Sequence, residues 1–338
     1  MKQSILITGG AGFIGSNFVP EFCARHPDYN VIVLDKLTYA GDMSNLYECH
    51  GKSNYSFIQA DICDMNAMEE IFTSLDIRGV IHFAAESHVD NSINGPRAFI
   101  DTNITGTFNL LQAAYSYWMT APGQVRKSYE SCRFHHISTD EVYGSLGAEG
   151  LFTEKTAYAP NSPYSASKAS SDHIAHAFFK TYGLNVTISN CSNNYGPKQH
   201  AEKLIPKTIL NCIALKHIPV YGNGSNIRDW IYVKDHCKAI DLIFHSGKAG
   251  ETYNVGASNE QTNLSLVKMI CTIMDRKLPR ADGRSYMELI SYVQDRAGHD
   301  FRYAIDSTKI KNELGWVPET SFEDALEQTI DWYIRKAM

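Results

Sequence analysis

Residues 4–15 read SILITGGAGFIG, and this stretch decides the fold that the sequence predicts. Ser4 to Thr8 is a short apolar run typical of a buried strand, and a helical pattern begins around Phe13. Between strand and helix lies a G-x-x-G-x-x-G turn, made by Gly9, Gly12 and Gly15. Glycines let the backbone turn tightly and approach a pyrophosphate, which the free N–H groups of the following helix attract. This context, strand then helix, predicts a dinucleotide site.

The alternation of apolar strands and helical segments continues through the first half of the chain. Further strands are expected at Asn30–Leu34, Tyr55–Gln59, Gly79–Phe83, Phe134–Ile137 and Asn185–Ser189. Such alternation predicts βαβ units and a parallel sheet. We therefore expect an α/β fold, with a Rossmann-type doubly wound parallel sheet over residues 1–190. A smaller mixed α/β C-terminal substrate domain is expected over residues 191–338, with residues around 228–256 returning to the first domain.

Acidic and small residues at the ends of these strands favour NAD as the dinucleotide. Asp35-Lys36 follows the second strand, about 20 residues past the glycines, where a carboxylate accepts both ribose hydroxyls and repels a 2′-phosphate. NAD is therefore expected rather than NADP. Asp61-Ile62 is placed to border the adenine ring, and Ala84-Ala85 would let the chain pass close beside the cofactor.

Two neighbouring carboxyl groups stand at the end of the strand Phe134–Ile137. Thr139-Asp140-Glu141 follows it directly, at the sheet edge where open α/β folds bind ligands. Two neighbouring carboxyl groups can divide into an acid and a base when their environments separate their pKa values. These residues alone leave another interpretation open, in which Asp140 caps a turn and Glu141 is solvated.

Tyr164 and Lys168 lie one helical turn apart in an expected helix that follows Pro163 and reaches about Tyr182. Both side chains therefore project from one face of that helix. The opposite face is apolar and is expected to pack in the core or against a second subunit.

Composition excludes several classes of protein. The formal net charge is −6 and the apolar content is 43% over 338 residues, which gives no electrostatic footprint for nucleic acid. Eight scattered cysteines, with no cysteine or histidine pairing at metal spacing, predict reduced thiols and no metal site. No apolar run is long enough for a membrane span, and the N-terminus has no signal-peptide pattern. A cytoplasmic location is expected.

The glycine turn, Asp35 and the Tyr164-x-x-x-Lys168 helix together resemble the extended short-chain dehydrogenase/reductase superfamily, in particular its NAD-dependent epimerase/dehydratase family. Within it, several stretches are similar to the dTDP-glucose 4,6-dehydratases. They are residues 84–90 (AAESHVD), 138–144 (STDEVYG), 192–197 (SNNYGP), 202–206 (EKLIP), 228–230 (RDW) and 295–300 (DRAGHD). The similarity runs from Ser4 to about Trp332. The Asp140-Glu141 pair is its specific part, since epimerases of the same fold usually lack both carboxylates.

The resemblance implies which residues bind each molecule. NAD would be contacted by Gly9, Gly12, Phe13, Ile14, Gly15, Asp35, Lys36, Leu37, Thr38, Asp61, Ile62, Ala84, Ala85, Ser87, Thr102, Tyr164, Lys168 and Asn194. The nucleotide sugar would be contacted by Ser87, His88, Thr139, Asn193, Lys203, Leu204, Pro219, Tyr221, Arg228, Asn263, Arg296 and His299. Of these, Arg228 and Arg296 would pair with the diphosphate.

The resemblance also implies the reaction, that of an NAD-dependent hydro-lyase in deoxysugar biosynthesis. Tyr164 would accept the proton of sugar O4, with its pKa lowered by Lys168, while Thr139 holds O4 by a hydrogen bond. Glu141 would remove the C5 proton and protonated Asp140 would donate to the departing C6 hydroxyl. A hydride would pass from C4 to NAD and back to C6.

Departures from the family pattern keep alternatives open. Asn91 stands where the family often has Arg, and Lys198-Gln199-His200-Ala201 replaces a more aromatic segment just before Lys203. UDP-glucose 4,6-dehydratase is therefore the first alternative. A sugar-nucleotide 4-epimerase would need only Tyr164, Lys168 and NAD, and a non-catalytic dinucleotide sensor would need none of the catalytic set. The resemblance further implies a homodimer formed through the helices 98–117 and 164–182.

Overall fold

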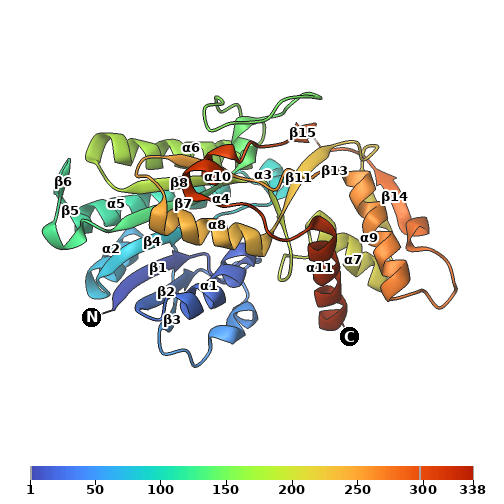
Figure 1. Cartoon of the computed structure of the whole chain (residues 1–338), viewed down its shortest axis with the longest axis horizontal. Helices are drawn as coiled ribbons and strands as arrows, with labels where there is room; N and C mark the ends of the chain where they lie inside the picture. The colour runs from blue at the N-terminus through green and yellow to red at the C-terminus, as the bar shows by residue number, and fades with distance from the viewer. Residues whose placement is uncertain (1, 297, 338) are drawn as a thin grey trace.

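The computed structural model describes residues 2–296 and 298–337, and a seven-stranded parallel sheet forms its centre (Figure 1). The strand order is β12-β8-β7-β4-β1-β2-β3. Their bounds are β1 (Gln3–Thr8), β2 (Tyr29–Asp35), β3 (Tyr55–Gln59), β4 (Ile77–His82), β7 (Arg133–Thr139), β8 (Val186–Cys191) and β12 (Thr252–Val255). Every pairing in this sheet is parallel. The expected Rossmann-type doubly wound fold is confirmed.

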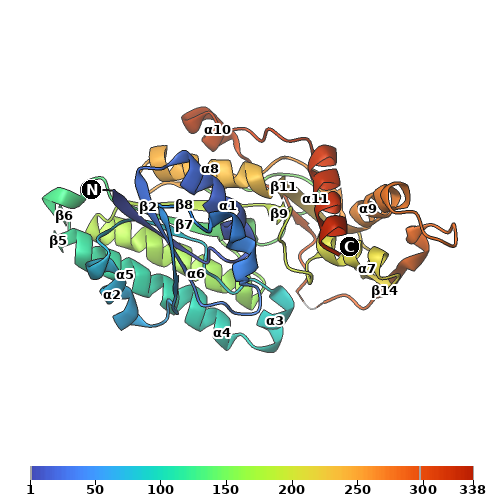
Figure 2. The same cartoon turned by 90° about the horizontal axis from the view of Figure 1, so that it is seen from below.

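Helices cover both faces of the sheet, so its central strands are apolar on both sides. Along β1, Ile5 and Ile7 belong to one core cluster and Leu6 to the other, as the period of two in a strand requires. One face carries α1 (Phe13–Arg25) and α8 (Val233–Ser246) (Figure 2). The other carries α2 (Met65–Ser74), α5 (Thr107–Trp118) and α6 (Pro163–Ala177).

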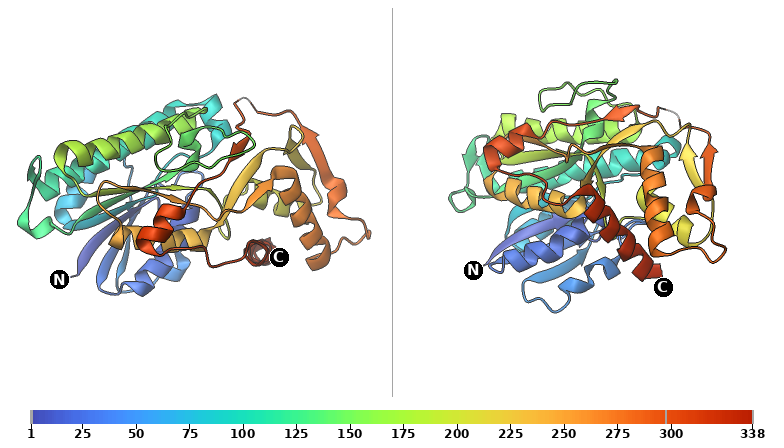
Figure 3. Two further views of the ribbon diagram at one scale, coloured as in Figure 1. Left: turned by 45° about the horizontal axis from the view of Figure 1, so that its top comes forward. Right: turned by 45° about the vertical axis from the view of Figure 1, so that its right-hand side comes forward.

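The C-terminal residues build a smaller lobe beside the carboxyl ends of the strands (Figure 3). Its helices are α7 (Leu204–Ile213), α9 (Asn263–Lys277) and α11 (Phe322–Ala337). β10 (Ile218–Tyr221) pairs in parallel with β14 (Ile290–Val293). A second small sheet joins β9 (Asn193–Tyr195), β11 (Ile227–Tyr232), β13 (Glu260–Thr262) and β15 (Arg302–Tyr303).

The chain crosses between the two parts more than once. After β11, α8 packs on α1 and β12 pairs with β8, which adds an edge strand to the main sheet. α10 (Thr308–Leu314) then lies near β12 before α11 returns to the smaller lobe. In the described residues, no helix is long and apolar enough to cross a membrane.

Several elements differ from the sequence-based expectation. Residues 123–131 were expected to be a loop, but β6 (Gln124–Val125) pairs with β5 (Met119–Ala121) and a 3-10 turn follows. The helix expected at 98–117 consists of α4 (Arg97–Phe99), a π-helical turn and α5. The sequence analysis did not predict α3 (Val89–Asn94), α9, β14 or α10. The elements α3, β14 and α10 are short and gain their stability from tertiary contacts. The 15-residue α9 was overlooked, although Leu266, Ile270 and Met274 have the helical spacing that could have identified it.

Candidate active site

A cleft with a volume of about 320 Å³ opens at the carboxyl ends of the parallel strands. The residues that follow β1, β2, β3, β4, β7 and β8 all contribute to its lining. The strand order reverses beside β1, since β2 and β3 lie on one side of it and β4 and β7 on the other. Open α/β sheets bind ligands at such a switch point.

The glycine turn brings backbone to backbone at the mouth of this cleft. Gly9 has a φ of +70°, and a Cβ there would lie 2.5 Å from the backbone nitrogen of Ala84. A Cβ on Gly15 would lie 2.4 Å from the carbonyl oxygen of Gly9. Gly12 begins α1 without any side-chain cap, so the first N–H groups of the helix stay available to an anion.

The carboxylate of Asp35 lies at the end of β2 and is partly committed to the backbone. It accepts the N–H of Ala11 at 2.9 Å and the N–H of Leu37 at 2.8 Å. A carboxylate has about four lone-pair sites, so two remain for the hydroxyls of a ribose. Beside it, Lys36 pairs with Asp61 at 2.6 Å. These features suit a dinucleotide. The free N–H groups of α1 and the tight glycine turn suit its pyrophosphate, and the remaining acceptors of Asp35 suit a ribose.

Asp140 and Glu141 begin a 3-10 turn (Asp140–Tyr143) directly after β7. The hydroxyl of Thr139, the last residue of the strand, accepts the N–H of Glu141 at 3.3 Å. Asp140 is 1% exposed, and its Oδ2 atom has no hydrogen-bond partner among the described residues. An unpartnered buried oxygen in a cleft is expected where a ligand supplies the missing partner. The alternative interpretation is not supported, because Thr139 rather than Asp140 caps the turn and Glu141 is half-buried in the cleft lining.

The surroundings of the two carboxyl groups separate their proton affinities. Burial raises the pKa of Asp140 well above its ordinary value, and the charges of Glu141 and Asp229 raise it further. Burial also raises the pKa of Glu141, but the cations of Arg296, Arg228 and Lys203 oppose that rise. Asp140 therefore holds a proton more strongly than Glu141, which is the division between acid and base that such a pair needs.

Tyr164 and Lys168 both line the cleft from the first turns of α6. The helix begins in a capping box, in which Ser162 and Ser165 exchange hydrogen bonds and Pro163 occupies the first helical position. Asn193 and Asn194, on β9, line the opposite side.

The pKa of Tyr164 is raised in this structure, so the lowering expected from Lys168 stays a prediction. Burial raises the pKa of the Tyr164 phenol well above its ordinary value, and the negative charge of Glu141 adds to the rise. The ammonium of Lys168 instead donates to the carbonyl oxygen of Ile137 at 2.8 Å. Burial lowers the pKa of Lys168 to about 8.

A buried polar network lies behind Lys168. The Nε2 atom of His136 lies 3.5 Å from the Lys168 ammonium and 3.2 Å from the carboxylate of Asp172. The other oxygen of Asp172 accepts the hydroxyls of Ser138 at 2.8 Å and Tyr158 at 3.0 Å. Burial raises the pKa of Asp172 to about 6, which leaves it ionised at neutral pH. Its charge raises the pKa of Lys168.

The cleft brings together most of the residues that the sequence singled out for NAD and catalysis. All of Thr139, Asp140, Glu141, Tyr164 and Lys168 line it. Of the expected NAD contacts, Leu37 does not line it, and its side chain packs against the hydrophobic core on the α1 face of the sheet. The remaining NAD contacts do, namely Gly9, Gly12, Phe13, Ile14, Gly15, Asp35, Lys36, Thr38, Asp61, Ile62, Ala84, Ala85, Ser87, Thr102 and Asn194.

The expected substrate contacts divide into two groups. Ser87, Thr139, Asn193 and Lys203 line the cleft, and Lys203 also donates to the carbonyl oxygen of Ser87 at 3.1 Å. The others lie outside its lining, namely His88, Leu204, Pro219, Tyr221, Arg228, Asn263, Arg296 and His299.

The outer group lies near the cleft without lining it. Arg296 pairs with Asp90 at 3.5 Å and lies 5.9 Å from the centre of the Tyr221 ring. The interpretation of Arg228 and Asp229 as a surface ion pair is not supported, since the Arg228 guanidinium is buried and donates to the carbonyl oxygens of Ile227, Asp300 and Phe301. Within the loop 295–299, Ala297 lies outside the described residues.

Three further expected contacts have local structural partners. The Nδ1 atom of His88 accepts the N–H of Asn91 and so caps α3. Asn263 is the first residue of α9, and its N–H donates to Asn226. His299 bonds to Asp295 at 2.6 Å, while its Nε2 atom has no partner among the described residues.

Some lining residues were not predicted as contacts. Glu202 lies in the cleft wall beside His88, His200 and Lys203, at 3.6, 3.5 and 3.9 Å. It was quoted within a similar stretch but given no role. Cys191 and Ser192 end β8, and their position at a strand end was the signal that could have found them.

Known proteins resemble this chain over nearly its whole length. A family model described as GDP-mannose 4,6 dehydratase matches residues 6–329. A dTDP-glucose 4,6-dehydratase from Shigella flexneri is 52% identical, over 98% of this chain and 93% of its own length. The chain belongs to the dTDP-glucose 4,6-dehydratase family.

Solved structures of similar fold include members of this family and related epimerases. A dTDP-glucose 4,6-dehydratase from Streptomyces venezuelae, solved with NAD bound, is 42% identical with a TM-score of 0.89, covering 98% of this chain and 97% of its own. A UDP-glucose 4-epimerase from Thermotoga maritima, at 28% identity, reaches a TM-score of 0.86 over 99% and 100% of the two chains. Because dehydratases and epimerases share the fold, the side chains of the cleft must separate them.

Proposed function

We propose that this protein is an NAD-dependent dTDP-glucose 4,6-dehydratase, a hydro-lyase that converts dTDP-glucose to dTDP-4-keto-6-deoxyglucose and water. The observation that carries the proposal is the pair Asp140 and Glu141 at the end of β7, beside Tyr164 and Lys168. A 4-epimerase has no step that needs an acid and a base of this kind. Relatives that are 51–52% identical to this chain are named for the same substrate and reaction.

Bound NAD supplies a hydride acceptor for sugar carbon 4 and a hydride donor for carbon 6. In the proposal, the glycine turn and the free end of α1 hold its pyrophosphate, and Asp35 holds a ribose. Tyr164 takes the proton from O4, and Lys168 is the cation that the chain supplies to favour the phenolate. Thr139 orients O4.

Glu141 and Asp140 then carry the loss of water. Glu141, kept nearer to ionisation by Arg296, Arg228 and Lys203, removes the proton from carbon 5. Asp140, which burial keeps protonated, donates to the hydroxyl that leaves carbon 6. In the proposal, Arg228 and Arg296 also pair with the diphosphate of the substrate.

The test is turnover of dTDP-glucose against UDP-glucose, read by product mass and by the absorbance that 4-keto-6-deoxy sugars develop in alkali. A product lighter by one water molecule, with dTDP-glucose strongly preferred, is the expected result. The same loss chiefly from UDP-glucose would keep the reaction and change the nucleotide. An unchanged mass with both sugars, even with added NAD, would contradict the dehydratase and favour an epimerase.

We also propose that the protein works as a homodimer in the cytoplasm. The surface of α4 to α5 carries exposed apolar side chains, with Ile100 and Phe108 both more than 40% exposed. Phe108 meets Phe178, next to the end of α6, at 6.2 Å between ring centres. All eight cysteines are free thiols, which suits a reducing compartment.

A further inference from the structure

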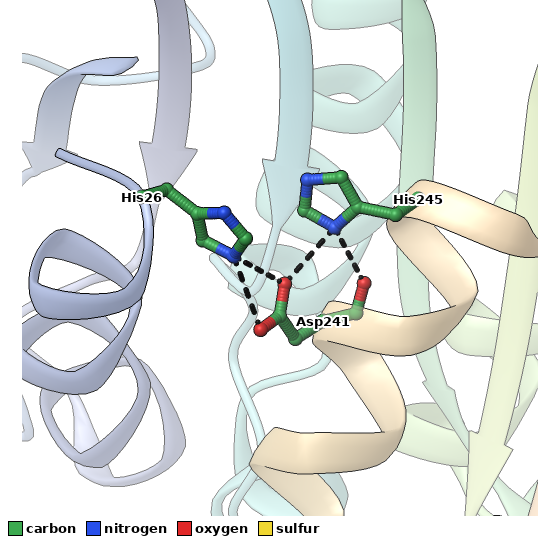
Figure 4. A group of neighbouring side chains, drawn as sticks. All are labelled: His26, Asp241 and His245. Atoms are coloured by element: carbon green, nitrogen blue, oxygen red, sulfur yellow. Dashed lines mark hydrogen bonds and ion pairs between the residues drawn. The ribbon is translucent and has the colours of Figure 1, made fainter. Parts of the chain in front are cut away.

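His26, Asp241 and His245 form a cluster on the face of the sheet that carries α1 and α8 (Figure 4). His26 follows the last residue of α1, and Asp241 and His245 lie one turn apart near the end of α8. Both imidazole rings point toward the Asp241 carboxylate. None of the three residues lines the cleft, and the proposed function gives them no role.

The three side chains offer donor atoms at close range. The Nε2 atom of His26 lies 2.9 Å from Oδ1 of Asp241, and the Nδ1 atom of His245 lies 3.0 Å from the same oxygen. Neighbouring donors that each lie about 2.0–2.1 Å from a metal are about 3 Å apart in a square-planar or octahedral site and about 3.3 Å apart in the tetrahedral site that zinc prefers. All three donor atoms lie within 4.8 Å of one another.

We propose that His26, Asp241 and His245 bind a divalent transition-metal ion of the zinc, nickel or copper class. Two imidazoles and a carboxylate are ligands that such ions prefer. The helix end adds a second, independent preference for a cation, because the last turns of α1 and α8 meet here and helix C-termini carry partial negative charge. The side chains are 25%, 12% and 31% exposed, so an ion can enter from solvent.

The surroundings supply a partner for a metal-bound His245. Its Nε2 atom lies 3.1 Å from the Tyr29 hydroxyl. When Nδ1 binds a metal, the ring proton moves to Nε2 and donates to this hydroxyl, which fixes the tautomer and the ring orientation. Without a metal, Nδ1 instead donates to the carbonyl oxygen of Asp241 at 2.8 Å, so the ion competes with a hydrogen bond.

The guanidinium of Arg25 competes with a metal ion for the Asp241 carboxylate and determines which of its oxygens is available. Arg25 lies 3.2 Å from Oδ2 of Asp241, which leaves Oδ1 as the metal ligand. The Arg25 side chain is 42% exposed and also pairs with Glu21 at 2.9 Å, so it can turn toward Glu21 when an ion enters. The bound ion would join the end of α1 to α8.

The sequence spacing did not predict this site, and the expectation of no metal site is set aside by the proposal. Asp241 and His245 have the i, i+4 spacing of a helical ligand pair, but His26 is 215 residues from Asp241 in the chain. Only the packing of α1 on α8 brings the third ligand to the other two.

The test is zinc and nickel titration of the full-length protein by calorimetry, with thermal unfolding in the presence of each ion or of a chelator. One ion per chain should bind, and it should raise the unfolding temperature. His26→Gln, His245→Gln and Asp241→Asn should each weaken binding at least tenfold. Tyr29→Phe should weaken it by about tenfold, as loss of an outer-shell partner does. His217→Ala, at an exposed histidine away from the cluster, should change nothing.

Variants that fail to fold are recognised by circular dichroism in chelator, and cobalt then serves as a second probe. Bound cobalt should show visible ligand-field bands in the wild type that change in each ligand variant but not in His217→Ala. Binding that all three ligand variants retain would place the ion elsewhere. No binding to the wild type would leave the cluster as a hydrogen-bonded contact between α1 and α8, and either result overturns the proposal.

Discussion

The chemistry proposed for the cleft depends on single side chains whose proton affinities burial and neighbouring charges have altered. Asp140 and Glu141 are adjacent in the chain, but different charges act most strongly on them. After burial, the largest influences on the pKa of Asp140 are the charges of Glu141 and Asp229, whereas those on the pKa of Glu141 are the cations of Arg296, Arg228 and Lys203. The pair titrates as a unit, so its macroscopic pKa values belong to both residues.

Replacing either carboxyl group should stop dehydration at a different stage. Glu141→Gln and Asp140→Asn should each lower kcat by about 10²–10⁴-fold. Asp140→Asn should still exchange the C5 proton of the sugar with solvent deuterium, which mass spectrometry detects, whereas Glu141→Gln should not. Glu149→Gln, an exposed control on the following loop, should keep full activity. C5 exchange in Glu141→Gln would remove Glu141 from the role of base.

The pH dependence of kcat should be bell-shaped. Glu141 must be ionised to act as a base, and its pKa is raised, so activity should fall as pH drops through a value above that of an ordinary glutamate. Asp140 must be protonated, and Lys168 must be charged with a pKa of about 8, so activity should also fall on the alkaline side. Steady-state rates across the pH range test this, and a flat acidic limb would contradict it.

Asp172 should control the alkaline limb of that profile through Lys168. Its charge raises the pKa of Lys168, so Asp172→Asn should move the loss of the Lys168 proton below about pH 8 and shift the limb to lower pH. A purely structural role would lower activity or stability without moving the limb. Rates of Asp172→Asn and Asp172→Glu across pH distinguish these, since the glutamate keeps the charge and should restore the limb.

At the level of elements, two segments border the cleft. One relies on close approach of backbone to backbone, and the other is held by a buried lysine side chain. The first is the glycine turn between β1 and α1. The second is the segment 198–201, whose sequence departs from the family pattern. Lys198 has a φ of +68°, and its ammonium donates to the carbonyl oxygens of Ser16 and Asn45 and pairs with Glu48. The segment is therefore tied to α1 and the turn after β2.

Gly9→Ala should lower the free energy of unfolding by more than backbone strain alone would. A left-handed φ costs a non-glycine residue about 1–2 kcal/mol, and here the new Cβ would also meet the backbone of Ala84 at 2.5 Å. Gly123→Ala is the matched control, because its φ is +72° with nothing within 4 Å. Urea unfolding should show a larger loss of stability for Gly9→Ala than for Gly123→Ala. NAD titration should show weaker binding for Gly9→Ala and unchanged binding for Gly123→Ala. Equal losses in the two variants would contradict the close approach.

Lys198→Met should loosen the segment 198–201. The ammonium is 10% exposed and bonds two carbonyl oxygens, so its loss should destabilise the protein by about 2–3 kcal/mol. Lys216→Met, at an exposed lysine after α7, should have no effect on urea unfolding. If Lys198→Met is equally neutral, the contacts seen here contribute nothing to stability. Its ratio of dTDP-glucose to UDP-glucose turnover should stay unchanged, because the side chain faces α1.

At the level of the whole molecule, the exposed apolar residues of α4 and α5 bear on oligomeric state. Phe108→Asp places a charge in the middle of the proposed dimer surface and should convert the dimer to a monomer. Light scattering after size-exclusion chromatography measures this. Leu215→Asp, at an apolar position on the smaller lobe that is even more exposed than Phe108, should leave the dimer intact. A monomeric wild type would contradict the proposal.

Local pattern in the chain determined the central sheet, the glycine turn and the strand-end position of Thr139, Asp140 and Glu141. These features follow from periodicity, backbone freedom and chain order, which neighbouring residues set on their own. The elements between residues 256 and 325 were mostly missed. The short strand β14 is held by its pairing with β10, whereas the apolar spacing within α9 was a local signal that could have identified that helix.

Only the tertiary structure decided how those residues behave. It buries Asp140 completely, brings cations from three distant segments to Glu141, bonds Lys168 to Ile137, and raises the pKa of Tyr164 by burial. It also joins His26 to a helix more than 200 residues away. Desolvation and long-range contact exist only once the chain has folded, so no spacing in the sequence could express them.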